Sequence, residues 1–216
     1  MNFRPRLGAI LLPLIGALLI PSAAGADERQ QILDAVKWAE PVMGRTCNFA
    51  PLKGGKDQAG SRYYEIKYRY RGQDQDSPDN IFPLLQLLCD RGAYNETFIF
   101  LTREDNGYRL LPFALPQIDY DYADEEFTKL KAPPRITGYK AVTDLANASF
   151  DPKTDRISMR AKWRGLGDAW SSGEWRFFEG EFILNEYIVD PVYEANSDHP
   201  EALRQEKYTI YKTGTP

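Results

Sequence analysis

Histidine and cysteine are scarce in this chain of 216 residues, which argues against several kinds of catalytic site. His199 is the only histidine, and it lies in a polar segment rather than in the packed setting that a Ser-His-Asp triad requires. The two cysteines, Cys47 and Cys89, form no C-x-x-C motif. The chain also has no G-x-S-x-G, H-E-x-x-H or phosphate-binding glycine motif. We therefore predict no catalytic residue, no cofactor and no metal, and we expect a protein that is not an enzyme.

Long apolar runs are also rare, and the one that stands out lies at the N-terminus. Two arginines precede an uncharged apolar segment, residues 8–20, and small residues ending in an A-x-A pattern at Ala26 follow it. This order is typical of a secretory signal peptide, and the apolar segment is too short to span a bilayer. The sequence thus predicts a signal peptide at residues 1–26 and a single β-rich domain at residues 27–216, either periplasmic or secreted, with no membrane span after cleavage.

That location gives the cysteines a role. In an oxidising compartment Cys47 and Cys89 are predicted to form one disulfide, which would close a loop of about 40 residues. Neither sulfur would then be a nucleophile or a metal ligand.

The chain has fewer basic residues than acidic ones. The predicted signal peptide carries two of the 27 basic residues and none of the 31 acidic ones, so the net charge of −4 becomes −6 in the remaining chain. A protein of this charge repels nucleic acid and anionic lipid surfaces and attracts cationic partners. Nucleic acid is therefore not an expected partner.

The residue pattern predicts a mainly β protein with one N-terminal helix. Residues 27–40 carry apolar side chains at helical spacing, and Pro41 is expected to end that helix. Residues 81–89 are almost continuously apolar and predict a central strand interrupted at Pro83. Other alternating or apolar segments predict strands at residues 62–71, 97–103, 108–113, 147–150, 156–163, 174–178, 182–189 and 207–212.

Turn residues join several of these strands into antiparallel hairpins. The predicted turns are residues 105–107, which contain Asn-Gly, residues 151–155 and residues 179–180. The hairpins are expected to pack as a sandwich or as a partial propeller-like assembly. Residues 116–134 mix acidic and aromatic residues and form either a linker between two β subdomains or a long loop packed over one sheet.

The densest acidic run raises the question of a calcium site. Asp119, Asp121 and Asp124 supply carboxylate oxygens of the kind that calcium prefers. The spacing lacks the glycine and terminal glutamate of an EF-hand loop. A solvated loop is therefore the preferred interpretation, and calcium is the weaker one.

Tryptophans are concentrated near one predicted hairpin and suggest a binding surface. Trp163, Trp170 and Trp175 would bind a protein partner or a glycan if they were exposed on a rigid sheet. The alternative is that they belong to the core, which is the more common place for aromatic residues in β proteins.

Two sequence blocks together resemble a known family. They are C-D-R-G-A-Y-N at residues 89–95 and R-G-L-G-D at residues 164–168. Between residues 81 and 187 the chain resembles the secreted bacterial proteins catalogued as domain of unknown function eleven seventy-six. The resemblance implies a β-rich periplasmic protein and brings no catalytic residue with it. Members usually carry a cysteine directly after R-G-L-G-D and a partner further on; Ala169 stands there in this chain, so that later cysteine pair is absent.

The R-G-L-G-D block itself predicts a structural turn. Gly165 and Gly167 flank a leucine and permit a sharp turn or a bulge. Asp168 would cap this turn or pair with Arg164.

These observations favour a binding or interaction protein whose partner is an unknown protein or glycan of the cell envelope. One specific version is an inhibitor of a cationic enzyme that attacks the envelope, such as lysozyme, and the net charge motivates it. The alternative is a hydrolase of envelope glycan that uses two carboxylates across one cleft.

Overall fold

The computed structural model describes residues 23–54, 60–193 and 206–214. The predicted signal peptide lies mostly outside these residues and stays a prediction, and His199 also lies outside them. The first element, α1 (Ala23–Met43), is longer than the helix predicted at residues 27–40, because it begins at Ala23 and continues through Pro41. The proline is so close to the end of the helix that it interrupts only the last turn, and the Gly44 N–H still donates to the Glu40 carbonyl at 2.8 Å.

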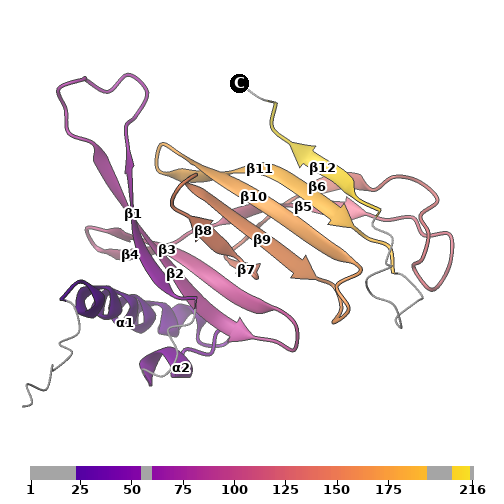
Figure 1. The fold of residues 1–216 in the computed structure, drawn as a ribbon, viewed down its shortest axis with the longest axis horizontal. Helices are drawn as coiled ribbons and strands as arrows, with labels where there is room; N and C mark the ends of the chain where they lie inside the picture. Colours follow the sequence, from indigo (N-terminus) through magenta and orange to yellow (C-terminus); the bar gives the residue numbers. More distant parts are fainter. Residues whose placement is uncertain (1–22, 55–59, 194–205, 215–216) are drawn as a thin grey trace, which may run out of the picture.

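The first sheet is antiparallel and carries α1 on one face (Figure 1). A short helix, α2 (Ala50–Lys53), lies beside α1. The strands of this sheet are β1 (Arg62–Tyr68), β2 (Asn80–Arg91), β3 (Glu96–Glu104), β4 (Gly107–Leu110) and β7 (Asp144–Ala146), and both β4 and β7 pair with β3.

The predicted interruption at Pro83 is wrong. β2 runs without a break past this residue, which pairs with Glu65 of β1. Pairing with β3 begins only at Leu84, so the missing N–H of the proline removes no hydrogen bond on that side of the strand.

The second sheet is also antiparallel and has the order β12, β11, β10, β9, β8. Its hairpins confirm the predicted turns at residues 151–155 and 179–180. A two-stranded ribbon of β5 (Phe113–Asp119) and β6 (Arg135–Val142) lies behind this sheet in Figure 1. The strands of the second sheet are β8 (Ser149–Asp151), β9 (Arg156–Lys162), β10 (Trp170–Phe178), β11 (Glu181–Asp190) and β12 (Tyr208–Lys212).

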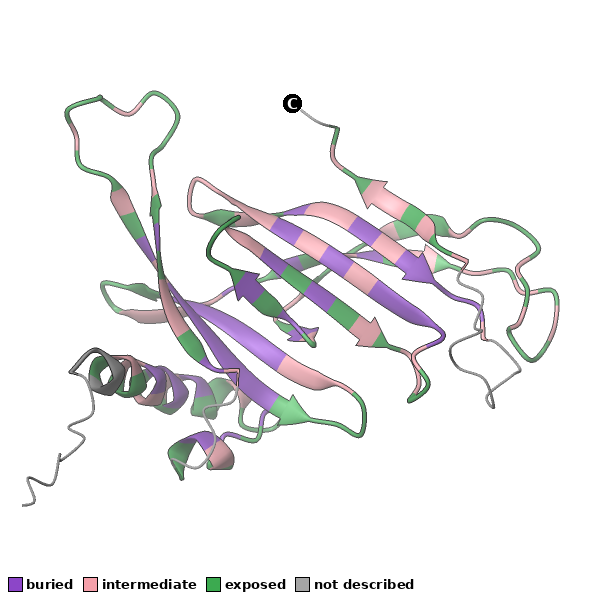
Figure 2. Cartoon of the chain, viewed as in Figure 1, coloured by how far each residue is buried: buried purple, intermediate pink, exposed green. Residues whose placement is uncertain are grey.

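β2 and β3 lie in the middle of the molecule and are buried on both faces (Figure 2). Side chains such as Leu84 and Phe100 face the second sheet, whereas Leu85 and Ile99 face α1. This explains why these strands are almost continuously apolar instead of alternating. The architecture is therefore a β-sandwich with one helical layer outside it. Among the described residues, no helix is both long and apolar enough to span a bilayer.

The predicted disulfide between Cys47 and Cys89 is confirmed. It joins the segment after α1 to β2, at a point where the pairing of β2 with β3 shifts register. The Asn48 N–H donates to the Cys89 carbonyl at 2.6 Å, so the two segments are also joined through the main chain.

Candidate functional site

The first of the two blocks that carry the family resemblance contacts the residues directly before the second block. The Tyr94 hydroxyl donates to the Trp163 carbonyl at 3.3 Å, and the side-chain amide of Asn95 donates to the Lys162 carbonyl at 2.8 Å. The Lys162 N–H in turn donates to the Asn95 Oδ1 at 3.1 Å. The turn between β2 and β3 is therefore bonded to the end of β9 and to the loop after it. The Asn95 side chain bonds to both main-chain groups of Lys162, as a neighbouring strand would.

Asn147 completes this joint from a third segment. Its side-chain amide donates to Asn95 Oδ1 at 2.7 Å and to the Arg160 carbonyl at 2.8 Å, while its own Oδ1 accepts the Glu96 N–H at 2.8 Å. Asn147 has a φ of +46°, a left-handed conformation that asparagine tolerates better than most residues.

The R-G-L-G-D segment forms a tight turn closed by an ion pair. Arg164 Nε lies 2.8 and 3.1 Å from the two carboxylate oxygens of Asp168, and its Nη2 also bonds to Oδ2. The Asp168 side chain is fully buried, and its hydrogen bond raises the pKa of Arg164. The Gly167 N–H donates to the Arg164 carbonyl at 3.0 Å with a glycine φ of +72°, while Gly165 lies against the Tyr94 ring.

The three tryptophans have different environments. Trp175 is completely buried and Trp170 is 3% exposed. The indole of Trp175 packs on Phe113 and donates to the Ala114 carbonyl at 3.2 Å, whereas Trp170 lies under the Arg160 guanidinium. The expectation that these two rings are displayed to a partner is therefore corrected, because they belong to the core. Trp163 alone of the three is half-buried.

Trp163 belongs to a group of aromatic rings at the end of the sandwich, which we call the aromatic end cluster. It contacts Tyr120 and Tyr193 with ring centroids 5.4 and 6.5 Å apart. Tyr122 is half-buried, and this burial raises the pKa of its hydroxyl to about 12. The members of the cluster are Tyr120, Tyr122, Phe127, Trp163 and Tyr193.

The loop after β5 adjoins this cluster and contains two of the three candidate calcium ligands, Asp121 and Asp124, whereas Asp119 is the last residue of β5. Asp119 pairs with Arg135 at 2.7 Å, and Asp121 pairs with Lys131 at 3.3 Å. Asp124 accepts the main-chain and side-chain hydrogen bonds of Thr128, whose hydroxyl contributes most to lowering the pKa of this carboxyl group. The structure thus gives each carboxylate a different partner. In the described ranges, no group of three acidic, cysteine or histidine side chains is arranged to hold a metal ion.

Phe127 is the exposed aromatic residue of this loop, and no sequence pattern indicated its role. It has a φ of +60°, unusual for an aromatic residue, and 45% of its surface is exposed. Its carbonyl accepts the Tyr193 N–H at 2.8 Å, and its ring packs edge-on against Tyr122 at 4.9 Å. We call residues 121–131 the Phe127 loop. Its main chain is paired with itself, since the Ala123 N–H donates to the Lys129 carbonyl at 2.8 Å.

A pocket of about 280 Å³ is lined by three glutamates, and the hydrolase alternative requires two carboxylates across such a cleft. Glu104 accepts a hydrogen bond from Arg109 at 2.5 Å, and Glu179 accepts the Arg71 N–H at 2.5 Å. These two carboxylates therefore hold a hairpin and a loop in place. Glu181 is the third.

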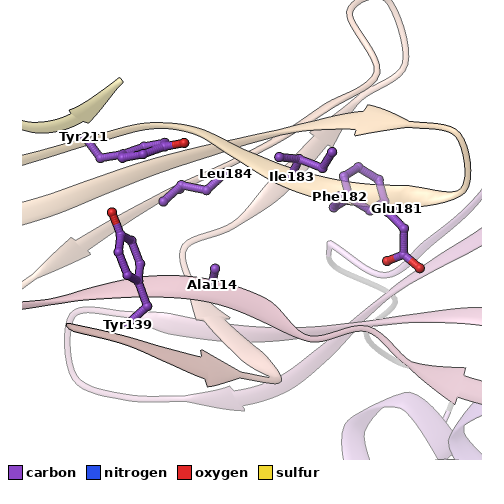
Figure 3. A pocket seen from close by; sticks show the side chains of 7 residues that line it. All are labelled: Ala114, Tyr139, Glu181, Phe182, Ile183, Leu184 and Tyr211. Atoms are coloured by element: carbon purple, nitrogen blue, oxygen red, sulfur yellow. The ribbon is translucent and has the colours of Figure 1, made fainter. Parts of the chain in front are cut away.

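An apolar groove of about 550 Å³ lies between the ribbon β5–β6 and the edge of the second sheet (Figure 3). Tyr139 of β6 and Tyr211 of β12 face each other across it, with ring centroids 6.2 Å apart. The first residues of β11 form the rest of the wall, and Ala114 of β5 lies on the opposite side.

Comparison with known proteins places the chain in a family. The profile of the family described as a protein of unknown function, DUF1176, matches residues 79–191, which include the joint and the R-G-L-G-D turn. This chain belongs to the DUF1176 family. It is similar to the uncharacterized protein YpfG of Escherichia coli (strain K12), with 24% identity over 174 residues. That match covers 79% of this chain but only 40% of YpfG. No solved structure matches the chain.

Proposed function

We propose that this DUF1176 protein is a non-enzymatic binding protein that contacts a cationic partner through the Phe127 loop. The exposed side chain of Phe127, in a loop that also carries exposed carboxylates, carries the proposal. Glu125 and Glu126 precede it directly and are exposed, as Asp121 is. An aromatic side chain beside charges of one sign suits a partner that offers an apolar contact within a basic surface.

The loop is ordered before any partner arrives. Asp124 fixes Thr128, Tyr122 bridges to Leu130, and the Phe127 carbonyl is held by Tyr193. A contact residue that is already held in place loses less conformational entropy on binding. The free-energy cost of the left-handed conformation at Phe127 is already offset by contacts within the folded protein. Binding of a partner therefore does not have to offset it.

Charge adds a long-range contribution. Residues 119–131 contain five acidic and two basic side chains, and the whole chain is acidic. Such a surface increases the rate at which a basic protein reaches it, and salt reduces this effect.

The predicted signal peptide and the disulfide support a location in the periplasm or outside the cell. In that location a basic enzyme that attacks the envelope, such as lysozyme, is the specific partner that we propose. The half-buried Trp163 would not contact the partner itself. It would support the rings of Tyr120 and Tyr193, against which it packs.

The experiment is a lysozyme assay with the purified protein at micromolar concentration. We expect inhibition that weakens with added salt and is lost in Phe127→Ala and in the double variant Glu125→Gln/Glu126→Gln. Tyr70→Ala removes a ring of similar exposure elsewhere and should inhibit as the unmodified protein does. Full lysozyme activity at all concentrations would remove lysozyme as the partner. A capture experiment with envelope extract, comparing the unmodified protein with Phe127→Ala, then tests whether the loop binds any basic protein.

A further inference from the structure

The edge of β11 is only partly covered by its neighbour. β12 pairs with β11 from Glu186 to Val189, and the Thr213 N–H then donates to the Asn185 carbonyl at 2.8 Å. No described strand pairs with residues 181–184 on that side. Within the part of the chain that the structure describes, the first four residues of β11 therefore form an open sheet edge beside the groove of Figure 3.

The hairpin turn before β11 decides which main-chain groups face this edge. Glu179 and Gly180 both have positive φ, +49° and +91°, as a two-residue turn of this type requires. Phe178 and Glu181 are opposite one another and close the turn, so they form the first hydrogen-bonded pair. Because such pairs alternate along an antiparallel ladder, the N–H and C=O groups of Phe182 and Leu184 point away from β10, towards the open edge.

We infer that this edge binds an extended peptide segment of a partner protein, which adds to the second sheet in line with β12. Unpaired main-chain groups spaced two residues apart are what an added strand recognises. The open stretch of four residues spans about 13 Å, which fits about four residues of extended chain.

The side chains around the edge define the chemistry of that peptide. On the inner side, Tyr139, Tyr211 and Ala114 enclose an apolar space of about 550 Å³, which would accept an apolar side chain. Glu181 is exposed at the start of the strand and shares the outer face with Ile183, itself 38% exposed. Because side chains alternate in a strand, the peptide should carry an apolar residue facing inwards next to a lysine or arginine facing outwards.

The test uses a library of random dodecapeptides displayed on phage and selected on the intact protein. The strongest binder is then synthesised and followed by amide hydrogen exchange. We expect an apolar residue adjacent to a basic one, and protection of the Phe182 and Leu184 amides by at least about tenfold on binding. The Ile183 amide already bonds to β10, so its exchange should not change and serves as an internal control.

Variants of the peptide and of the protein distinguish strand addition from simple apolar contact. N-methylation of the peptide at the positions that face β11 should weaken binding about tenfold per group, whereas N-methylation at the alternate positions should not. Tyr139→Ala should weaken binding about tenfold, and Tyr70→Ala, a tyrosine of equal exposure outside the groove, should leave it unchanged. Glu181→Gln should remove the preference for the basic residue.

Several results would overturn the inference. They are the absence of any selected binder, binding without protection of the two amides, and equal effects of both N-methylation patterns. A concentration-dependent dimer that protects the same amides without peptide would assign the edge to a second copy of this chain instead. The variant Phe127→Ala should bind the peptide normally. A failure of the strand-addition inference is therefore distinct from a failure of the Phe127 loop proposal.

Discussion

The side-chain carbonyl of Gln86 accepts the main-chain N–H of Phe150 at 3.0 Å and so links the two sheets of the sandwich. Gln86 is the one polar residue in the apolar run of β2 and is 4% exposed. Its amide nitrogen donates to the Gly60 carbonyl at 2.6 Å. One side chain therefore satisfies a buried donor of β8 and an acceptor of the segment before β1.

Replacing this residue with leucine should destabilise the fold. Gln86→Leu keeps the approximate size of the side chain but leaves the Phe150 N–H and the Gly60 carbonyl without their partner. An unsatisfied buried group costs about 1–3 kcal/mol, so the free energy of unfolding should fall by about that amount. Urea denaturation measures it, and Gln117→Leu, on an exposed position of β5, is the control. Equal stability of the two variants would contradict the role assigned to Gln86.

The disulfide should contribute more than any single hydrogen bond. Cys47 and Cys89 are 42 residues apart, and a loop of this size gives about 4 kcal/mol on the chain-entropy estimate. The double variant Cys47→Ala/Cys89→Ala should therefore show a clearly lower urea midpoint. Reduction of the unmodified protein with dithiothreitol should reproduce most of this loss. An unchanged midpoint after complete reduction would show that packing and the main-chain hydrogen bond from Asn48 to Cys89 hold these segments together without the disulfide.

The parts of the fold that could be predicted are those specified by neighbouring residues. The hairpins between β3 and β4 and between β10 and β11 follow from turn residues that favour positive φ, such as Gly107 and Gly180. The sequence did not predict β5, because Pro116 and the mixed acidic and aromatic residues that follow hide its alternation, and it did not predict its partner β6 either. Pro116 instead pairs with Tyr139 inside the ribbon.

The candidate sites depend on contacts between distant residues, and this is why the sequence did not indicate them. Trp175 belongs to the core because the second sheet folds onto Phe113, and no local pattern distinguished this position from an exposed one. Phe127 is exposed because its loop is fastened to Tyr193, 66 residues further along the chain. The open edge of β11 depends on where β12 ends, at Lys212.

The buried ion pair of the R-G-L-G-D turn should matter more than an exposed one. Arg164→Met removes the guanidinium from a fully buried Asp168 carboxylate and should lower the free energy of unfolding by about 2–4 kcal/mol. Adding Asp168→Asn to that variant should restore part of the loss, because the buried charge is then absent. Arg135→Met breaks an exposed pair with Asp119 and should cost about 0.5 kcal/mol or less. Similar losses for Arg164→Met and Arg135→Met would contradict this assignment.

The Phe127 loop should loosen in acid. The hydroxyl and N–H of Thr128 lower the pKa of Asp124 below its usual value of 3.8 in the folded protein. A lowered folded-state pKa stabilises the loop above the unfolded-state value and loses that effect as the pH falls through the folded-state value. The Thr128 amide shift, followed by NMR, should therefore titrate with a midpoint below 3.8, and Asp124→Asn should abolish the titration.

Thr128→Val distinguishes the two hydrogen bonds that lower this pKa. It removes the hydroxyl, which is the larger cause, and keeps the main-chain N–H, so the Asp124 midpoint should rise towards 3.8 without reaching it. If the geometry of the Phe127 loop presents Phe127 to a partner, Asp124→Asn should weaken binding of that partner. Acidification below the folded-state pKa of Asp124 should also weaken it. A midpoint at or above 3.8 in the unmodified protein would show that Asp124 does not hold the loop, and the ordering of Phe127 would then rest on Tyr122 and Tyr193 alone.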